Sequence, residues 1–169
     1  MPWPPVAAPP PLSAAQLDER RVAGLASYKS RHYLEAVRSL SEVAKVRPED
    51  NEVKDALARS MDQVKALGSA LKAFNEGDFE SAKRLLWPLR TQDKDNEDVK
   101  ELLFKSYFND GVAKLQSEQM AKAAEAFTDA VKITEDREAQ RHLQFAKRYG
   151  SGATDLLAKI YVKHLTPRP

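Results

Sequence analysis

The feature that most constrains this chain is a block of residues that occurs three times with the same internal spacing. The copies read YLEAVRSLSEV from Tyr33, FESAKRLLWPL from Phe79 and MAKAAEAFTDA from Met120. In each copy an alanine lies three positions after the first residue, a large apolar residue four positions later, and another apolar residue three further on. Steps of three and four place side chains on one face of an α-helix. The chain is therefore expected to repeat a helical element and to form no strands.

A second small residue lies twelve positions before each of these alanines. The pairs are Gly24 with Ala36, Ala70 with Ala82, and Gly111 with Ala123. Small residues on two consecutive helices allow an antiparallel pair to approach closely, and the large residue after the turn fills the end of the hairpin. Hairpins of this kind bury a continuous core only when they stack on one another. We predict three stacked helical hairpins.

Start and stop signals give the expected helix boundaries. Ser13 is a suitable N-cap for a first helix that runs to about Lys29. An apolar stripe over residues 53–74 predicts a long helix, capped by Asp50 or Asn51 after Pro48 has ended the one before. A later helix is expected to begin at Asp95 or Asn96.

The stretch NEGDFESAKRLLWP, residues 75–88, is expected to form the corner of the second hairpin. Gly77 should end the long helix, Asp78 should cap the next, and Phe79 should fill the hairpin end. Pro88 should kink or end the helix that follows, because it removes a hydrogen bond at about 3 kcal/mol in a helix interior. Trp87 lies off the inward stripe. Two roles stay open for it, namely packing on the neighbouring long helix or an exposed anchor on the convex face.

Taken together, these positions resemble the tetratricopeptide repeat (TPR) family. The resemblance rests on Gly24, Tyr33, Ala36, Leu40 and Pro48, on Ala70, Gly77, Asp78, Phe79, Ala82 and Leu86, and on Gly111, Ala123, Phe127 and Ala130. It implies an all-α array of antiparallel helix hairpins, a TPR-like α-solenoid with C-terminal capping helices. The alanine-to-alanine intervals are 46 and 41 residues, longer than the 34 usual for the family. The first helices of the second and third hairpins should therefore be lengthened.

Three segments follow from this organisation. Residues 1–12 form a Pro-rich tail or linker, which is expected to be extended and contains a PxxP spacing that a Pro-binding domain could recognise. Residues 13–149 form the repeat domain. Residues 150–169 contain a capping helix, apolar at Leu156, Leu157, Ile160, Tyr161 and Leu165, and a tail. An alternative role for that helix is docking to a partner or to a second copy.

Charge and composition exclude several classes of function. The 27 basic and 25 acidic residues leave a net charge of +2, and no dense Lys/Arg run indicates a nucleic-acid partner. The absence of cysteine excludes disulfides and thiol catalysis. No apolar run approaches the roughly 18 residues of a membrane span, so no membrane insertion is expected. Without a signal-peptide pattern we expect a cytoplasmic protein, provided that Met1 is the natural start.

No pattern in the sequence carries catalytic chemistry. The histidines at positions 32, 142 and 164 show no ligand spacing on one helix face, and we expect them to be solvated or capping residues. The run DKDNED at 93–98 begins like an EF-hand loop, but Asp98 stands where glycine is needed and Phe104 where the bidentate glutamate is needed. Carboxylates at a helix start explain this run better. We predict no catalytic residue, no cofactor and no metal site.

The resemblance implies a concave groove, lined by the first helix of each hairpin, that receives an extended or helical peptide. The matching positions predict partner contacts at Arg21, Leu25, Tyr28, Lys29, Leu67, Leu71, Phe74, Lys105, Phe108 and Asn109, and Trp87 is added as the convex anchor. Such a groove, apolar with basic edges, suits an amphipathic or hydrophobic segment with acidic flanks. Leu25 occupies the slot that relatives with a carboxylate clamp fill with asparagine. The alternative is that these side chains are core between adjacent helices.

We therefore expect a non-catalytic protein–protein interaction module, a scaffold or adaptor. The alternative is a regulatory or dimerisation domain excised from a larger multidomain protein, with the Pro-rich start as its former linker. Either way the partner is a protein or peptide.

Overall fold

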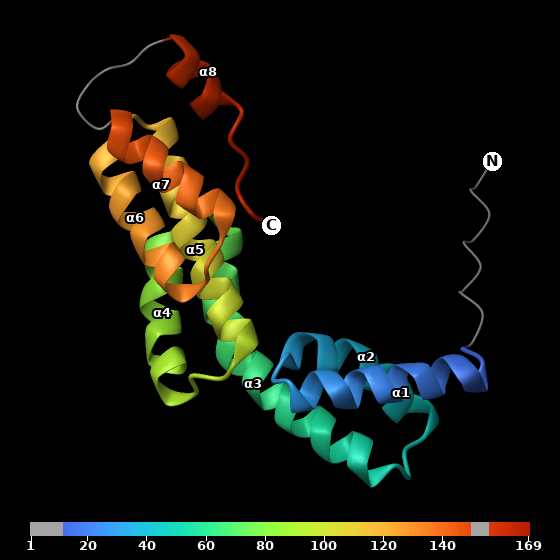
Figure 1. Cartoon of the computed structure of the whole chain (residues 1–169). Coiled ribbons are helices and arrows are strands. Elements are labelled where there is room, and N and C mark those ends of the chain that lie inside the picture. The colour runs from blue at the N-terminus through green and yellow to red at the C-terminus, as the bar shows by residue number, and fades with distance from the viewer. Residues whose placement is uncertain (1–11, 150–155) are drawn as a thin grey trace, which may run out of the picture. The chain divides into compact units, whose positions relative to one another are not determined.

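The computed structural model describes residues 12–149 and 156–169, and all regular structure in these residues is α-helical, as expected (Figure 1). In chain order the helices are α1 (Ala14–Lys29), α2 (Tyr33–Val46), α3 (Asn51–Asn75), α4 (Phe79–Gln92), α5 (Glu97–Gln116), α6 (Met120–Ile133), α7 (Arg137–Tyr149) and α8 (Leu156–Lys163). The Pro-rich segment with its PxxP spacing lies outside the described residues, apart from Leu12. Among the described helices, none is long and apolar enough to cross a membrane.

Residue contacts divide the chain into two compact units, with the boundary after Gln63. The boundary lies inside α3. The first unit contains α1, α2 and the first half of α3, and the second unit contains the rest of α3 and helices α4 to α8. The expected repeat domain at 13–149 is therefore described here as two units.

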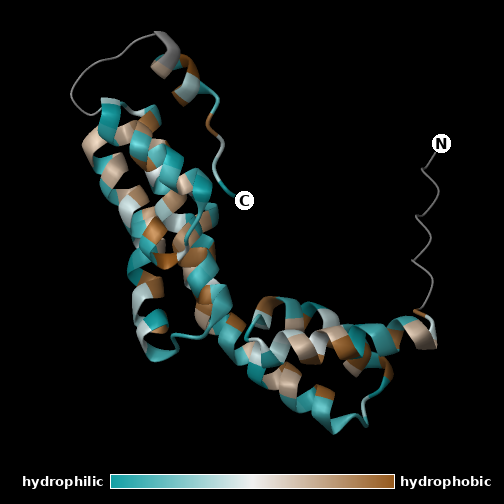
Figure 2. Ribbon diagram, in the orientation of Figure 1, coloured by the Kyte–Doolittle hydropathy of each residue, from teal (hydrophilic) through white to brown (hydrophobic). Residues whose placement is uncertain are grey.

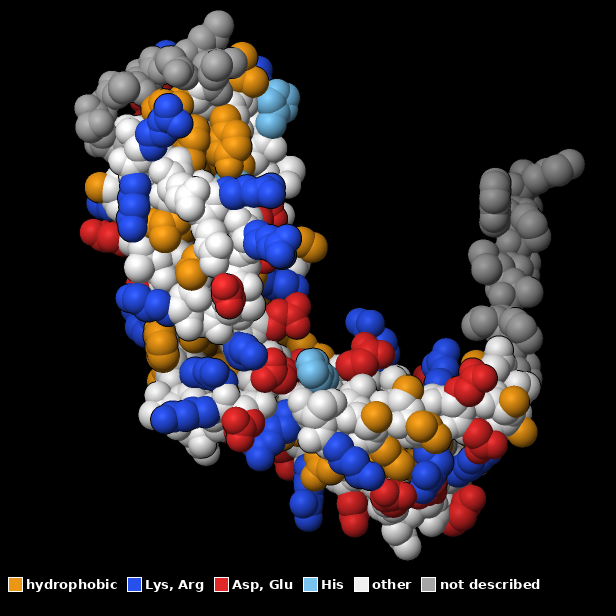
Figure 3. All heavy atoms as spheres, viewed as in Figure 1, with side chains coloured by type: hydrophobic (Ala, Val, Ile, Leu, Met, Phe, Trp, Pro, Cys, Tyr) orange, Lys and Arg blue, Asp and Glu red, His pale blue; other side chains and the backbone are white. Residues whose placement is uncertain are grey.

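In both units, buried apolar residues alternate with exposed polar ones along the helices, except in α5, which is buried on two sides. Apolar positions recur among hydrophilic ones along each helix (Figure 2), and on the visible face Lys and Arg side chains are interspersed with Asp and Glu (Figure 3). The core of the first unit consists of Leu25, Ala36, Leu40, Val43, Val53 and Ala56. Gly24 lies against this core, since a Cβ atom there would stand 2.5 Å from Leu40 Cδ2. The small residue of the first helix thus faces the large residue of the second.

Helix α5 is the centre of the second unit. Twelve of its 20 residues are buried. On one side it packs with α3 and α4 around Leu67, Ala70, Leu86, Val99, Leu102 and Leu103. On the other it packs with α6 and α7 around Phe104, Phe108, Val112, Leu115, Ala123, Phe127, Ala130, Ala139 and Ala146. A helix with core on both sides can present only a narrow strip of its surface to a ligand.

The turns of the three hairpins have the same backbone geometry. Arg31, Gly77 and Glu118, which are equivalent in the repeated spacing, all have positive φ, at 61°, 78° and 59°. The next residue of each turn donates its N–H to a carbonyl five residues back, over 2.9, 2.9 and 2.8 Å. This is the hydrogen bond of a Schellman motif, which uses a left-handed residue to end a helix. The expected corner is confirmed: Gly77 ends α3, and Asp78 Oδ1 accepts from Ser81 N over 3.0 Å.

This geometry predicts that Glu118→Gly stabilises the protein by about 1 kcal/mol, because a left-handed conformation costs an L-residue roughly that amount and costs glycine nothing. Urea denaturation followed by circular dichroism measures the change. As a matched control, Glu125→Gly at an exposed position inside α6 should destabilise by about 1 kcal/mol. Destabilisation by both substitutions would contradict the turn geometry.

The caps of the longer first helices also match expectation. Asp50 Oδ1 accepts from Val53 N over 3.2 Å at the start of α3, and Asn96 Oδ1 accepts from Val99 N over 3.1 Å at the start of α5. Ser13 forms a capping box with Gln16 at the start of α1. Side-chain acceptors at these positions satisfy N–H groups that have no partner within the helix.

Of the two outcomes expected at Pro88, a kink or the end of the helix, the end is wrong. Helix α4 continues through Pro88 to Gln92. Leu89, the next residue, packs against the core shared with α3 and α5. Thr91 Oγ1 also donates to Trp87 O over 2.9 Å. Tertiary packing and this local bond hold the last turn in place despite the missing N–H of proline.

Helix α8 exposes one of the apolar positions of the expected capping helix. Ile160 is 47% exposed. Ala158 is buried instead, and Tyr161 is half-buried against α7. The side chains of Leu156 and Leu157, and residues 150–155, lie outside what the structure describes.

Candidate peptide-binding groove

The side chain of Asn109 on α5 is bound to the main chain of a distant residue. Its Nδ2 donates to Arg168 O over 2.8 Å, and its Oδ1 accepts from Arg168 N over 2.6 Å. Asn109 is only 4% exposed. A side-chain amide that satisfies both main-chain groups of one residue recognises backbone, because these groups are common to every amino acid except proline.

The guanidinium group of Arg168 lies in a site built from α5 and the start of α7. Its Nη2 donates to both carboxylate oxygens of Asp136, over 3.1 and 3.0 Å, and to Glu138 Oε2 over 2.8 Å. Its Cζ lies 4.8 Å from the ring centroid of Phe108 and 5.7 Å from that of Phe104. Two carboxylates and two aromatic faces thus surround one cation, an arrangement that suits the planar guanidinium.

Contacts within α5 and at the start of α7 also help to position these groups. Phe104 and Phe108 are one helical turn apart on α5 and share a face of it, and Asn109, the next residue, also contacts Arg168. Asp136 accepts from Ala139 N over 2.8 Å and thereby caps α7, which fixes its carboxylate. Glu138 lies in the first turn of α7, where the helix dipole favours negative charge. We call these five residues (Phe104, Phe108, Asn109, Asp136 and Glu138) the Asn109 groove.

His142 packs against Phe108, one of the residues of the Asn109 groove, and the expectation that it is solvated is wrong. It is 3% exposed, and its ring lies 5.4 Å from Phe108 and 5.2 Å from Phe127. Its Nδ1 is 2.6 Å from Tyr161 Oη, which ties α8 to α7. Its Nε2 lies 3.7 Å from Glu138 Oε1. Burial lowers the pKa of His142, despite the opposing charge of Glu138, so the ring is neutral at pH 7.

The lowered pKa of His142 predicts a pH-dependent stability. In the unfolded chain the ring binds a proton near pH 6.5, whereas in the folded protein it does so only at lower pH. Because the unfolded state then binds more protons, the free energy of unfolding falls as pH decreases below about 6.5, by at most about 1.4 kcal/mol per pH unit.

Urea denaturation between pH 7 and 5 measures this slope. His142→Phe should flatten it, because the ring keeps its aromatic neighbours but cannot titrate. His32→Asn, at an exposed histidine, should keep it. An unchanged slope in His142→Phe would mean that the pH dependence does not come from His142.

Trp87 contacts the neighbouring helix α5 and is also partly exposed, and its role as a partner anchor stays a prediction. It is 46% exposed, and its Nε1 donates to Tyr107 Oη on α5 over 2.9 Å. Lys83, one turn earlier on α4, lies 4.8 Å from the Tyr107 ring centroid and forms an ion pair with Asp110 over 2.8 Å. Trp87 therefore covers the edge of a charged contact between α4 and α5 and keeps an open face.

The predicted contacts on α1 lie in the first unit, and most are engaged there. Arg21 forms ion pairs with Asp50 and Glu52, over 2.6 and 2.7 Å, and these hydrogen bonds raise its pKa further above its usual range. Leu25 is buried in the core. Tyr28 is half-buried and Lys29 is exposed, and with Leu25 they line a shallow pocket of about 220 Å³.

The predicted contacts on α3 and the cation on α5 lie in the second unit. Leu67 is 1% exposed and belongs to the core. Leu71 and Phe74 are half-buried, and Phe74 packs edge to face on Phe79 with ring centroids 5.6 Å apart. Lys105 forms an ion pair with Glu101 over 2.8 Å. The core alternative therefore holds for Leu25 and Leu67 and also for Phe108, which is fully buried, whereas Leu71, Phe74 and Lys105 are partly exposed.

Of the predicted contacts, the structure brings Phe108 and Asn109 together in the Asn109 groove. The sequence reasoning missed Asp136, Glu138 and Arg168. A signal was present for one of them, because Asp136 stands before α7 as Asp50 stands before α3. The position of Arg168 carried no such signal.

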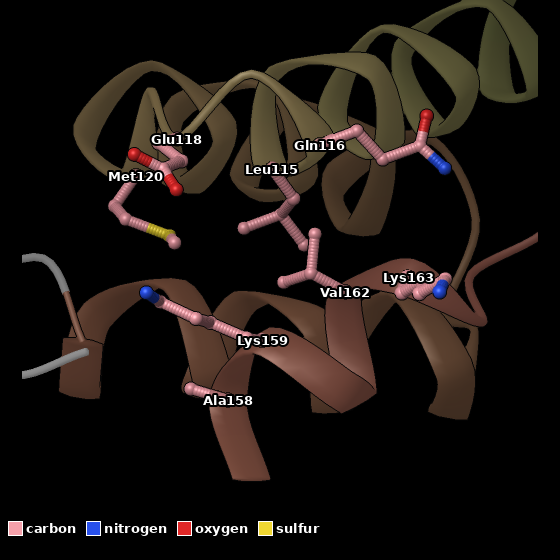
Figure 4. Close-up of a pocket in the computed structure, with 8 residues that line it drawn as sticks. All are labelled: Leu115, Gln116, Glu118, Met120, Ala158, Lys159, Val162 and Lys163. Carbon is pink, nitrogen blue, oxygen red and sulfur yellow. The ribbon is translucent and has the colours of Figure 1, made fainter. Parts of the chain in front are cut away.

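A hollow with a volume of about 480 Å³ lies between the α5–α6 turn and α8. Leu115 and Met120 line one side, and Ala158, Lys159 and Val162 line the other (Figure 4). The side chains of Leu115 and Val162 point toward each other across it (Figure 4). Helix α8 is thus incompletely packed on the helices beneath it.

Comparison of the chain with protein-family models, with curated proteins and with solved structures gives no match. The function is therefore inferred from the geometry of the Asn109 groove. The groove offers a side-chain amide that can bind a peptide backbone, and two carboxylates and two aromatic faces that can bind a cation.

Proposed function

We propose that this protein is a non-catalytic protein–protein interaction module, a TPR-like array of helical hairpins whose first helices bind an extended segment of a partner. The observation that carries the proposal is the pairing of Asn109 with both main-chain groups of Arg168. A strip of α5 already holds an extended stretch of polypeptide in the way that a receptor helix holds a peptide. A scaffold or adaptor role follows from that capacity.

The repeated architecture supports the TPR-like part of the proposal. The three hairpin turns share one left-handed residue and one hydrogen-bond pattern. The small residues Gly24 and Gly111 lie against Leu40 and Phe127, which occupy equivalent places in their hairpins. The same contacts at the same spacing are what a repeat of one structural element requires.

Partner capture with variants of α3 tests the proposal. Leu71→Glu with Phe74→Glu places two charges on the half-buried apolar strip of this helix. The matched control is Ala66→Glu with Ser69→Glu, which adds two charges at the same spacing on exposed positions of the same helix. Circular dichroism must show both variants folded.

We expect proteins captured from an extract of the source cells by the wild type and by the control to be lost from the Leu71/Phe74 variant. Mass spectrometry identifies them. If the folded Leu71/Phe74 variant keeps every partner, the α3 strip is not a binding surface.

A further inference from the structure

Residues 165–169 of the chain lie in the Asn109 groove in the manner of a bound peptide. Gln116 Nε2 donates to Leu165 O over 3.3 Å, and Leu165 packs against the core shared by α5, α6 and α7. Three residues later, Arg168 forms the contacts with Asn109, Asp136 and Glu138 that are described above. The segment is therefore held at both ends, by main-chain bonds and by one specific side chain.

We propose that the Asn109 groove recognises an extended segment with an arginine between two prolines, and that residues 165–169 are its resident occupant, which a partner segment of the same chemistry must displace. The inference rests on the proposed function, that helix faces of this protein bind peptides. It adds the class of ligand and a self-occlusion that regulates access.

The class of ligand follows from the backbone and side-chain groups that the Asn109 groove contacts. The bonds to Asn109 accept any residue with a free N–H at that position. The side-chain site is selective, since a guanidinium group can meet two carboxylates and stack on Phe104 and Phe108 at once, whereas a lysine ammonium is a compact point charge. Arginine is thus the specific element of the ligand.

The flanking prolines explain why the segment is extended. Thr166 precedes Pro167, and Arg168 precedes Pro169. A residue before proline is restricted to extended conformations. The segment therefore loses little conformational freedom when it docks, and a partner with the same pattern shares that advantage.

The resident segment is suited to displacement because the helix that precedes it, α8, is short and incompletely packed. Helix α8 has eight residues, Ile160 on it is exposed, and a hollow of about 480 Å³ separates it from the α5–α6 turn. A tethered segment acts at an effective concentration on the order of 1 mM. A segment that binds as a free peptide at about 10 μM would then reduce the affinity for a competitor about 100-fold.

Fluorescence anisotropy with a labelled peptide of the sequence HLTPRP tests the proposal on the full chain. Arg168→Glu places a carboxylate against Asp136 and Glu138 and should expel the resident segment. We expect the peptide to bind the Arg168→Glu chain at least tenfold more tightly than the wild type. Lys147→Glu, at an exposed position of α7, is the charge-matched control and should behave as the wild type does.

Two further arms test the recognition itself. Adding Asn109→Ala to Arg168→Glu should abolish the gain in affinity. A peptide with lysine in place of arginine should bind at least tenfold more weakly to the Arg168→Glu chain. Equal binding of the peptide to wild type and Arg168→Glu, or binding that ignores Asn109→Ala, would overturn the proposal.

Amide hydrogen exchange follows the resident segment directly. The N–H of Arg168, which donates to Asn109, should be protected in the wild type and should lose protection when saturating peptide is added. Fast exchange in the wild type would overturn the proposal. So would a wild type that dimerises with concentration and returns to a monomer in Arg168→Glu, because the segment would then occupy a second copy.

The outcomes separate this inference from the proposed function. Partners that are lost from the Leu71/Phe74 variant but captured equally by wild type and Arg168→Glu would leave the interaction module standing and remove the self-occlusion. If the peptide exchanges with the resident segment at the Asn109 groove but the Leu71/Phe74 variant keeps every partner, the self-occlusion stands and the α3 strip is not a binding surface.

Discussion

Asp110→Ala is expected to lower the free energy of unfolding by about 3 kcal/mol, because it breaks a buried ion pair between α4 and α5. Asp110 Oδ2 accepts from Lys83 Nζ over 2.8 Å and from Lys114 Nζ over 2.6 Å. Lys83 is 8% exposed. Without Asp110, its remaining ion-pair partner among the described residues is Glu80, whose side chain is mostly in solvent.

The electrostatics of Lys83 show how closely this lysine depends on its partners. Burial acts to lower the pKa of Lys83, but hydrogen bonds to Asp110 and Glu80 outweigh it, so that the pKa is raised above its ordinary value. The same balance makes the loss of Asp110 costly, since desolvation of the ammonium group remains while most of the compensation is gone.

Urea denaturation at pH 7 measures the effect. Lys83→Met combined with Asp110→Leu should recover most of the loss, because both buried charges are then removed together and Lys114 keeps Glu80 at 3.5 Å. If the double variant is as unstable as Asp110→Ala, the loss comes from packing and not from the unpaired charge.

Gly111→Ala is expected to destabilise the protein by about 2 kcal/mol through overpacking. A Cβ atom at Gly111 would stand 2.8 Å from two ring carbons of Phe127 and 2.9 Å from a third. The ring is fully buried and packs edge to face on Phe108 with centroids 5.7 Å apart, so it has little room to move. Helices α5 and α6 would have to separate.

Gly68→Ala is the matched control for this prediction. Gly68 lies inside α3, and apart from its chain neighbours and the backbone of its own helix no described atom lies within 4 Å of a Cβ built on it. The change should therefore stabilise by about 1 kcal/mol, because alanine is the better helix former and confines the unfolded chain. Thermal denaturation of both variants gives the comparison. A Gly111→Ala protein as stable as the wild type would mean that α5 and α6 are not in close contact.

Local features of the fold could be predicted from the sequence because they depend on residues near one another in the chain. The spacing around Ala36, Ala82 and Ala123 gave the hairpins, and Gly77 with Asp78 gave the turn between α3 and α4. Whether helix α4 kinks or ends at Pro88 could not be decided in this way. It continues because Leu89 packs on residues of α3 and α5, which the local sequence does not contain.

The candidate site also contains residues that could be predicted from nearby sequence and residues that depend on distant contacts. Phe108 and Asn109 were predicted from their place on the first helix of a hairpin. Their ligand, Arg168, is 59 residues from Asn109 in the sequence, and the contact depends on how α8 and the following segment return across α5. Trp87 and Tyr107 meet for a similar reason, since they come from different helices.

The docking of residues 165–169 also affects how the protein should be produced. An affinity tag or a fusion partner joined after Pro169 adds chain directly beside the arginine site. Depending on its charge, the added chain will hold the segment in the groove or draw it out, and an acidic tag will compete with Asp136 and Glu138 for Arg168. The affinity measured for any ligand of this groove will therefore depend on which end of the chain carries the tag.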